Sequence, residues 1–456
     1  KEIISRFIGF LTTIYIAKKI GPTNFGNINL SLVILSYFEL FSDFGISTVA
    51  IKELARETSK KKFFIIRILI LRLLFSFFSF VVLCLITKLF WNNVLDITVI
   101  YGLTLLIGAF TLEWVFIAFE KMLASNIIII IFKIIYAAAI FYFIKLPNHY
   151  IRIPIIFTLS AAMTAIFLVI LLYNILIKEN NEDKNNKILN KNFFQNIINS
   201  ALPLFISMFF VQIIINSDTL ILGYFRSAFE VGIYNAAYRL IFFIAAIGTV
   251  YYNTIFPRLS KLYKENHNEL FVILNFTSKF ICYLSIPMAF GCIILSKKII
   301  LFFYNDQYIQ AIFAFSGLTI ATALMLINNI YCRAMIACDR HKEYLKIVIF
   351  QATINFIPGL FFIPKYGITA AVLLTILAEI SGFYFYYKSF SKILIIPFLP
   401  YLIKALFSSI IMSAFLLFFI NWNLFILIIS GILIYFTILY SIKGFTFAEI
   451  KTFLKK

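Results

Sequence analysis

IGFLTTIYIAKKIGPTNFGNINLSLVILSYFELFSDFGISTVA, residues 8–50, contains two consecutive apolar segments of membrane length. Glu39 and Asp43 lie inside the second segment, and a charged stretch, residues 51–62, follows it. Ionisable side chains are costly in the hydrocarbon core, so we expect both acids to face a bundle interior or a water-filled cavity. This stretch predicts membrane helices with a polar interior.

A comparable unit recurs about 206 residues later in the chain. The sequence Gly26-Asn-Ile-Asn-Leu aligns with Gly232-Ile-Tyr-Asn-Ala, and Lys52 of the first basic stretch aligns with Arg258 of the second. The offset corresponds to six spans, an even number, so both halves start on the same side of the membrane. The pattern predicts a parallel repeat about an axis along the membrane normal, as transporters use.

The composition indicates an integral membrane protein. The chain of 456 residues is 62% hydrophobic and 18% aromatic, with a mean hydropathy of +0.98. Breaks at charged, Pro and Gly residues leave about fourteen apolar stretches, most long enough to span the hydrocarbon core as helices. We therefore predict an all-α membrane protein of about fourteen transmembrane helices, with the first two at residues 3–20 and 27–50. Because the chain starts with Lys1 rather than Met, we expect the natural N-terminus to be missing.

The predicted domain organisation has two six-helix lobes. An Asn-rich polar stretch, residues 178–197, is the predicted cytoplasmic linker between lobes at residues 1–177 and 198–392. Residues 393–456 add two helices and a cytoplasmic tail. The predicted external connections are short, which argues against a membrane glycosyltransferase or ligase with its reactive groups on a large loop.

The net charge of +20 could suggest nucleic acid, but its distribution indicates membrane topology instead. With a cytoplasmic N-terminus, more than half of the 40 Lys and Arg residues fall in inside loops and tails. The positive-inside rule then places both termini in the cytoplasm of a multi-pass cell-membrane protein. We expect the basic loops to contact membrane lipids, and no nucleic acid.

No residue pattern indicates catalysis or a cofactor. The five cysteines include no C-x-x-C pair, and the three histidines lie in different predicted loops. Neither a catalytic triad, nor a Gly-rich phosphate loop, nor a metal-ligand cluster is visible, so we predict a protein that is not an enzyme and needs no cofactor or metal.

Four cations within or near the spans are candidate contacts for an anionic cargo: Arg239, Arg6, Lys133 and Arg333. Polar residues on these faces can also act as contacts between helices, and we favour that interpretation for Ser, Thr, Asn and Gln. A cation in mid-membrane costs more, which favours a polar lumen. Lys133 could instead pair with Glu113. Arg239 is the leading candidate because it lies well inside its span.

Five acids are candidates for coupling or gating: Glu39, Asp43, Glu113, Asp218 and Glu379. Glu39 and Asp43 lie one helical turn apart and disfavour each other's ionisation, which would suit a proton- or sodium-coupled carrier. Alternatively, Asp43 caps or pins the end of its helix.

Several short motifs together resemble the Wzx-type polysaccharide-biosynthesis flippases of the multidrug/oligosaccharidyl-lipid/polysaccharide exporter superfamily. They include Gly21-Pro22-x-x-Phe25-Gly26, Asp43-Phe44-Gly45, Glu113-Trp114-x-Phe116, Ala237-Tyr238-Arg239 and Pro364-x-Tyr366-Gly367. Each motif alone is weak, but their order and spacing extend over nearly the whole chain.

The resemblance implies two six-helix lobes around a cationic cavity that opens alternately to either side. It implies a polyprenyl-diphosphate-linked oligosaccharide as cargo, flipped to the outer leaflet for cell-surface polysaccharide such as O-antigen. A glycan polymerase and glycosyltransferases are the implied protein partners. A multidrug exporter of the same superfamily and a lipid II flippase are the alternatives, and the sugar, the coupling ion and the oligomeric state stay open.

Overall fold

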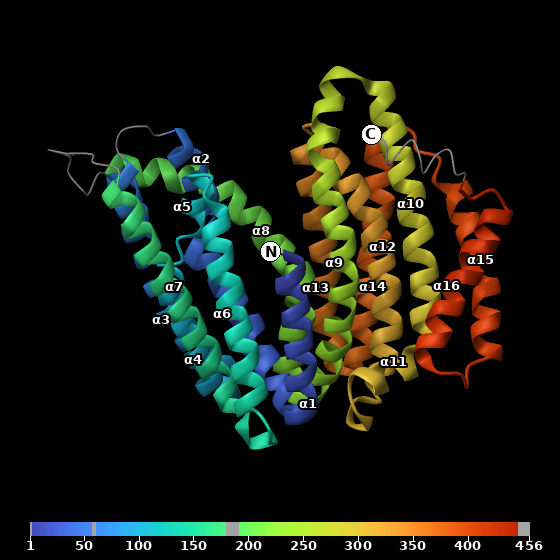
Figure 1. Cartoon of the computed structure of the whole chain (residues 1–456), viewed down its shortest axis with the longest axis horizontal. Coiled ribbons are helices and arrows are strands. Elements are labelled where there is room, and N and C mark those ends of the chain that lie inside the picture. The colour runs from blue at the N-terminus through green and yellow to red at the C-terminus, as the bar shows by residue number, and fades with distance from the viewer. Residues whose placement is uncertain (1, 57–60, 179–190, 446–456) are drawn as a thin grey trace. The chain divides into compact units, whose positions relative to one another are not determined.

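The computed structural model describes residues 2–56, 61–178 and 191–445, and this part of the chain is helical without a β-strand (Figure 1). The helices of the first half are α1 (Glu2–Asp43), α2 (Ile46–Arg56), α3 (Lys61–Phe90), η1 (Asn92–Val94), α4 (Leu95–Gly108), α5 (Glu113–Ala118), α6 (Met122–Phe143), η2 (Pro147–Ile151) and α7 (Arg152–Lys178). Those of the second half are α8 (Lys191–Phe225), α9 (Ala228–Glu265), α10 (His267–Ile294), α11 (Ser296–Phe303), η3 (Asp306–Tyr308), α12 (Ala311–Ala337), α13 (His341–Tyr366), α14 (Ile368–Phe390), α15 (Phe398–Phe418) and α16 (Leu424–Ser441).

Thirteen helical segments of the described chain are long and apolar enough to cross a membrane. The first runs from Ile4 to Ala55 and contains both of the first two predicted spans. The backbone of Gly21 is not helical (φ 75°, ψ 169°), so α1 is two helices joined at a kink next to Pro22. The predicted count of about fourteen and the observed thirteen differ by this junction, and the all-α membrane fold is confirmed.

Large apolar side chains on the molecular surface fit a membrane environment. Phe78, Leu123 and Phe418 have relative exposures of 69%, 82% and 82%. A soluble protein rarely exposes so many side chains of this kind in contiguous patches. Lipid tails solvate them instead, which leaves close packing and polar contacts to hold the helices together.

Some helix boundaries differ from the predicted spans. The apolar stretch at residues 97–119, another of the fourteen predicted spans, is two helices, α4 and α5, because the chain turns at residues 109–112. Helix α9 continues to Glu265, so the basic stretch from Arg258 to Lys264 is helical. Its leucines Leu259 and Leu262 are buried, which explains why this polar segment stays helical.

The chain divides into two compact units, Lys1–Asn235 and Ala236–Lys456, with the boundary inside α9. Most of the predicted linker, residues 179–190, lies outside the described residues, so the lobe boundaries at 1–177 and 198–392 stay predictions. Each unit is described separately below.

In the first unit, α1 packs against α3, α4, α6 and α8, and α7 packs against α4 and α6. The short helices α2 and α5 pack on each other, and their apolar faces form a common core with the ends of α3, α7 and α8. We call this core the α2–α5 cluster; its buried members include Val49, Leu54, Ile68, Leu112, Trp114, Val115, Phe116, Leu168 and Ala201.

The two glycines aligned by the sequence repeat meet in the first unit. A Cβ on Gly26 would lie 1.8 Å from the carbonyl oxygen of Ala228, and a Cβ on Gly232 would lie 1.9 Å from that of Pro22. The contact is reciprocal: Gly26 and Gly232 are 206 residues apart, the offset of the repeat, and so are their contacts Pro22 and Ala228. An isologous contact about a two-fold axis has this form, so the crossing agrees with the predicted pseudo-twofold repeat.

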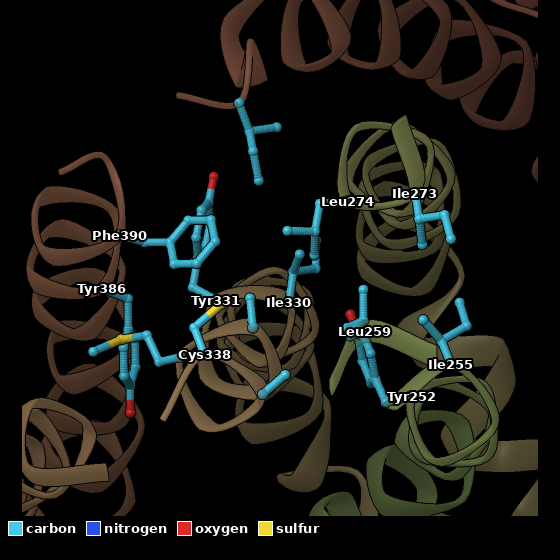
Figure 2. Close-up of a cluster of buried hydrophobic side chains, with 14 of the residues drawn as sticks. Tyr252, Ile255, Leu259, Ile273, Leu274, Ile330, Tyr331, Cys338, Tyr386 and Phe390 are labelled. Atoms are coloured by element: carbon cyan, nitrogen blue, oxygen red, sulfur yellow. The ribbon is translucent and has the colours of Figure 1, made fainter. Parts of the chain in front are cut away.

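In the second unit, α12 packs against α10 and α14, α14 packs against α13, and α10 packs against α15. Figure 2 shows a buried cluster that joins α9, α10, α12 and α14, with Leu259, Leu274, Tyr331 and Phe390 among its members. Helices α15 and α16 are attached through α10 by a second apolar cluster that contains Cys282, Met412 and Leu427.

Replacing Gly26 with Ala should lower the thermal stability of the detergent-solubilised protein. The added methyl would meet a backbone oxygen that cannot move aside, and overpacking of this kind typically costs about 1–3 kcal/mol. Gly9→Ala in the same helix is the control, since a Cβ there meets no heavy atom within 4 Å. Equal melting temperatures for the two variants would contradict the close crossing.

Candidate functional site

The predicted site residues fall in both units. The first unit holds Arg6, Glu39, Asp43, Glu113, Lys133 and Asp218, and the second holds Arg239, Arg333 and Glu379. The structure therefore brings them together only as smaller groups within each unit.

Arg239 is half-buried on α9, less than one turn after Ala236. The hydroxyl of the buried Tyr304, at the end of α11, donates to the Ala236 carbonyl oxygen at 2.9 Å. Burial raises the pKa of Tyr304, and the positive charge of Arg239 acts in the opposite direction. The α11 segment therefore supports the part of α9 that carries Arg239.

The other three predicted cations differ in their surroundings. Arg333, near the end of α12, is half-buried and lies over the ring of Phe256, 5.9 Å from its centroid. This is cation–π geometry, so an aromatic face of α9 already holds part of its charge. Arg6 on α1 and Lys133 on α6 are exposed. Glu113, the predicted ion-pair partner of Lys133, is half-buried in the first turn of α5.

Glu39 and Asp43 have different environments despite being one turn apart on α1. Glu39 is exposed, and among the described residues it makes no hydrogen bond or ion pair. Asp43 is the last residue of α1, and Ser47 donates a hydrogen bond to its carboxylate. Among the five predicted acids, Glu39 is thus the exposed one.

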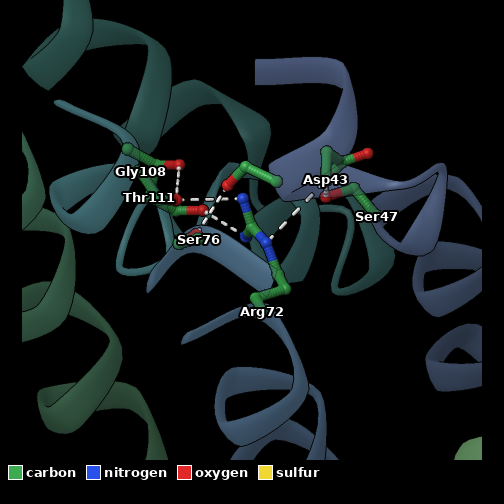
Figure 3. Close-up of polar contacts among 7 residues, drawn as sticks. Asp43, Ser47, Arg72, Ser76, Gly108 and Thr111 are labelled. Atoms are coloured by element: carbon green, nitrogen blue, oxygen red, sulfur yellow. Dashed lines mark hydrogen bonds and ion pairs between the residues drawn. The ribbon is translucent and has the colours of Figure 1, made fainter. Parts of the chain in front are cut away.

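Asp43 forms an ion pair with a residue outside the predicted site, Arg72 of α3 (Figure 3). The Nε of Arg72 lies 3.8 Å from Asp43 Oδ1, and the arginine is buried with 8% exposure. Its Nη1 and Nη2 donate to the carbonyl oxygens of Thr111 (3.1 Å) and Gly108 (2.9 Å). Sequence reasoning could have found Arg72 from its depth in an apolar span, but not its three partners. The ion pair supports the alternative that Asp43 pins the end of its helix.

Asp218 is buried between α8 and the start of α9. Tyr234 donates its hydroxyl to Asp218 Oδ2 at 2.8 Å, and the neighbouring Asn235 donates to Thr219 Oγ1 at 3.2 Å. Six residues earlier on α8, the carbonyl oxygen of Gln212 accepts a hydrogen bond from the hydroxyl of Tyr37 at 3.2 Å. These contacts fasten α8 to α9 and to the second half of α1.

Glu379 is buried in α14 and held by α12. The Nδ2 of Asn328 donates to Glu379 Oε2 at 2.7 Å and to its backbone oxygen at 2.9 Å. Gln351 of α13 donates to the Ala378 carbonyl oxygen at 3.2 Å and accepts from Tyr386 at 3.1 Å. Asn328 and Gln351 were not predicted, because their partners lie on other helices.

Charged side chains lie within membrane helices of both units, and in the part of the chain that the structure describes they form no metal cluster. Within the described residues, no group of three or more His, Cys, Asp or Glu side chains could hold a metal ion. Asp43, Asp218 and Glu379 each have a protein partner, while Glu39 is exposed. Half-buried Arg239 and Arg333 provide positive charge within membrane helices.

Comparisons with known proteins add family and fold information. A family model described as "Polysaccharide biosynthesis protein" matches residues 2–263. The chain is 27% identical over 169 residues to the "Probable flippase AglR" of Haloferax volcanii, which covers 36% of this chain and 35% of that protein. The match thus spans about a third of the relative's length.

Two solved structures show the same fold. The "Lipid II flippase MurJ, inward closed conformation" superposes with a TM-score of 0.76 at 17% identity, covering 95% of this chain and 96% of that one. An inward-facing multidrug resistance MATE family transporter of the MOP superfamily superposes with a TM-score of 0.64 at 13% identity, covering 85% and 95%. At these identities the likeness establishes the fold alone.

Replacing Asn328 with Leu should destabilise the second unit. The Glu379 carboxyl would stay buried without its donor, and an unsatisfied buried group costs about 1–3 kcal/mol. The double variant Asn328→Leu/Glu379→Leu removes both partners and should recover part of the lost melting temperature. If the loss of melting temperature in the double variant equals the sum of the losses in Asn328→Leu and Glu379→Leu, the interaction of the pair contributes nothing to stability.

Proposed function

The chain belongs to the polysaccharide biosynthesis protein family, and from this premise we propose that it flips a polyprenyl-diphosphate-linked oligosaccharide. The cargo moves from the cytoplasmic to the outer leaflet of the cell membrane, with both termini of the protein in the cytoplasm. The oligosaccharide then serves cell-surface polysaccharide assembly. No bond is made or broken in this process, so the protein acts as a carrier and not as an enzyme.

The observation that carries the proposal is the position of Arg239. Its guanidinium is half-buried inside a membrane helix, beside a segment anchored by the hydrogen bond of Tyr304. An arginine at this position can compensate the negative charge of a diphosphate, because a guanidinium forms charge-assisted hydrogen bonds with phosphate oxygens. Arg333, with Arg6 and Lys133, adds positive charge along the path.

Transport proceeds by alternating access. The diphosphate enters the polar interior from the cytoplasmic side, while the polyprenyl tail stays in lipid. An inside-negative potential favours this direction, since moving one negative charge outward releases up to about 2.3 kcal/mol per 100 mV. The sugar is solvated by polar side chains and water during the passage.

Glu39 is the best candidate for coupling the return of the empty carrier to a cation. Of the five candidate acids it is the exposed one, and the described residues provide its side chain with no hydrogen bond or ion pair. Asp43, Asp218 and Glu379 are held by Arg72, Tyr234 and Asn328. Their roles are therefore closer to gating or positioning, and Glu113 belongs with them as a less buried member.

Partners follow from the cargo. Glycosyltransferases must complete the lipid-linked oligosaccharide on the cytoplasmic side, and a glycan polymerase would use it after flipping. A lipid II flippase shares the fold, so the fold is compatible with a lipid-linked cargo. A multidrug exporter is the competing function, because its family shares the same fold.

The proposal can be tested with purified protein in liposomes that contain a fluorescent, short-chain polyprenyl-diphosphate oligosaccharide. Flipping is measured as the fraction that a membrane-impermeant quencher reaches on the outer surface. Protein-dependent exposure supports the proposal. Transport of cationic drugs without any exposure of the lipid-linked sugar would replace it with the exporter function.

Arg239→Ala should slow flipping by at least about tenfold, since a hydrogen bond to a charged group contributes about 1.5–3 kcal/mol. Arg239→Lys should retain part of the rate because it keeps the charge but not the fork of donors. Lys261→Ala, an exposed position on the same helix, is the matched control and should flip normally. Normal flipping by Arg239→Ala would exclude Arg239 from the cargo path.

A further inference from the structure

Arg72 connects two interruptions of membrane helices. One is the turn at Phe44 and Gly45 between α1 and α2, and the other is the turn at residues 109–112 between α4 and α5. The guanidinium contacts Asp43 at the first turn and the carbonyl oxygens of Gly108 and Thr111 at the second. Figure 3 shows these groups converging on one side chain.

The first turn is unfavourable without support from its surroundings. Phe44 has a φ of 49° and Gly45 a φ of 77°, and a bulky residue in the left-handed region costs about 1–3 kcal/mol. The ring of Phe44 stacks on Phe205 with centroids 4.4 Å apart, and a Cβ at Gly45 would lie 3.1 Å from the Ala201 carbonyl oxygen. Helix α8 therefore holds one side of this turn, and Arg72 holds the other.

Charges at the helix ends explain why an arginine is needed. Asp43 is at the C-terminal end of α1, where the helix dipole disfavours an acid, so a nearby cation compensates it. Gly108 is the last residue of α4, and its carbonyl oxygen also accepts from Thr111. A buried guanidinium satisfies several carbonyl and carboxylate oxygens at once, which an ammonium cannot do in the same geometry.

The two turns lead into the same packed body. The first precedes α2 and the second precedes α5, and these helices pack together in the α2–α5 cluster. Val49 and Ala50 of α2 and Val115 and Phe116 of α5 are all buried there. The two turns therefore flank one packed body.

We propose that Arg72 is a positioning residue that holds the two turns in register, so that α2 and α5 move as one body relative to α3 and α4. Its contact with Asp43 is the weaker one. That distance is 3.8 Å and the Asp43 side chain is 33% exposed, whereas the two carbonyl contacts have hydrogen-bond lengths. The body is released first at the α1–α2 turn, when Asp43 separates from Arg72. The carbonyl oxygens of Gly108 and Thr111 keep the guanidinium in place during that step.

Hydrogen exchange on the full-length protein in nanodiscs tests this proposal residue by residue. Arg72→Met should speed exchange by about tenfold in residues 40–56 and also in residues 106–118. Asp43→Asn should do so in residues 40–56 alone, because the carbonyl contacts remain. Arg72→Lys should restore slow exchange at no more than one of the two turns. Lys88→Met, an exposed position at the far end of α3, should change neither.

Three results would overturn the proposal. They are unchanged exchange in Arg72→Met, a uniform increase that includes residues 311–390, or the same effect from Lys88→Met. If Arg72→Met does not fold, Asp43→Asn decides: faster exchange confined to residues 40–56 supports the proposal, and unchanged exchange there overturns it. Faster exchange at both turns in Asp43→Asn would contradict the inference that Arg72 keeps its contacts with Gly108 and Thr111 when the Asp43 contact is lost.

The consequence for transport rests on the proposed flippase function. Arg72→Lys should slow flipping severalfold in the liposome assay while binding of the lipid-linked sugar stays within about twofold. Altered exchange with a normal flipping rate would refute the role in transport and leave the flippase function intact. Absence of flipping by the unmodified protein would refute the flippase function, and the exchange data, recorded without cargo, would still report on Arg72.

Discussion

The close crossing of α1 and α9 at Gly26 and Gly232 is the constraint on which the first unit depends. In a membrane no hydrophobic effect drives helices together, so association relies on van der Waals packing and polar contacts. A glycine at each helix lets the backbones touch, and any larger side chain would meet a carbonyl oxygen. This contact fixes the second half of α1 against α9, and the polar pairs Tyr234–Asp218 and Asn235–Thr219 then hold α8 beside them.

Polar residues in the membrane helices fall into two groups. In one, neighbouring helices provide hydrogen-bond or ion-pair partners, and in the other the side chain is exposed. Arg72 and Glu379 are buried, and their contacts come from neighbouring helices. Removing one partner from such a group is costly because the other stays desolvated, which makes these residues structural first. Glu39 is exposed on a membrane helix, and a carboxylate in that position needs water or a cation. Exposure and contacts thereby distinguish Glu39 from Asp43, Asp218 and Glu379, which residue type alone could not do.

Hydropathy and repeat spacing predicted much of the fold, because span length and the aligned Gly26 and Gly232 depend on local sequence. The continuation of α9 to Glu265 was not predicted, because the polar segment around the buried Leu259 lacks the hydropathy of a membrane span. Partnerships were harder to predict. Asp43 and Arg72 lie on different helices, as do Glu379 and Asn328, and sequence alone gives neither the depth nor the rotation of a helix. The candidate cations were therefore predicted from residue type and position in a span, whereas their contacts could be identified only in the structure.

The repeat also shows where the two halves differ. The offset that relates Gly26 to Gly232 carries Gly45 to Tyr251 and Arg72 to Ser278. Helix α9 passes through Tyr251 without a turn, so the second half has no left-handed junction at this place. Ser278 is buried and carries no charge to bridge two helix ends. A break in the helix and the arginine that supports it thus occur together in the first half and are both missing at the equivalent positions of the second. Since a continuous helix transmits displacement along its whole length and a broken one can bend, the first half is the one built to change shape at this position.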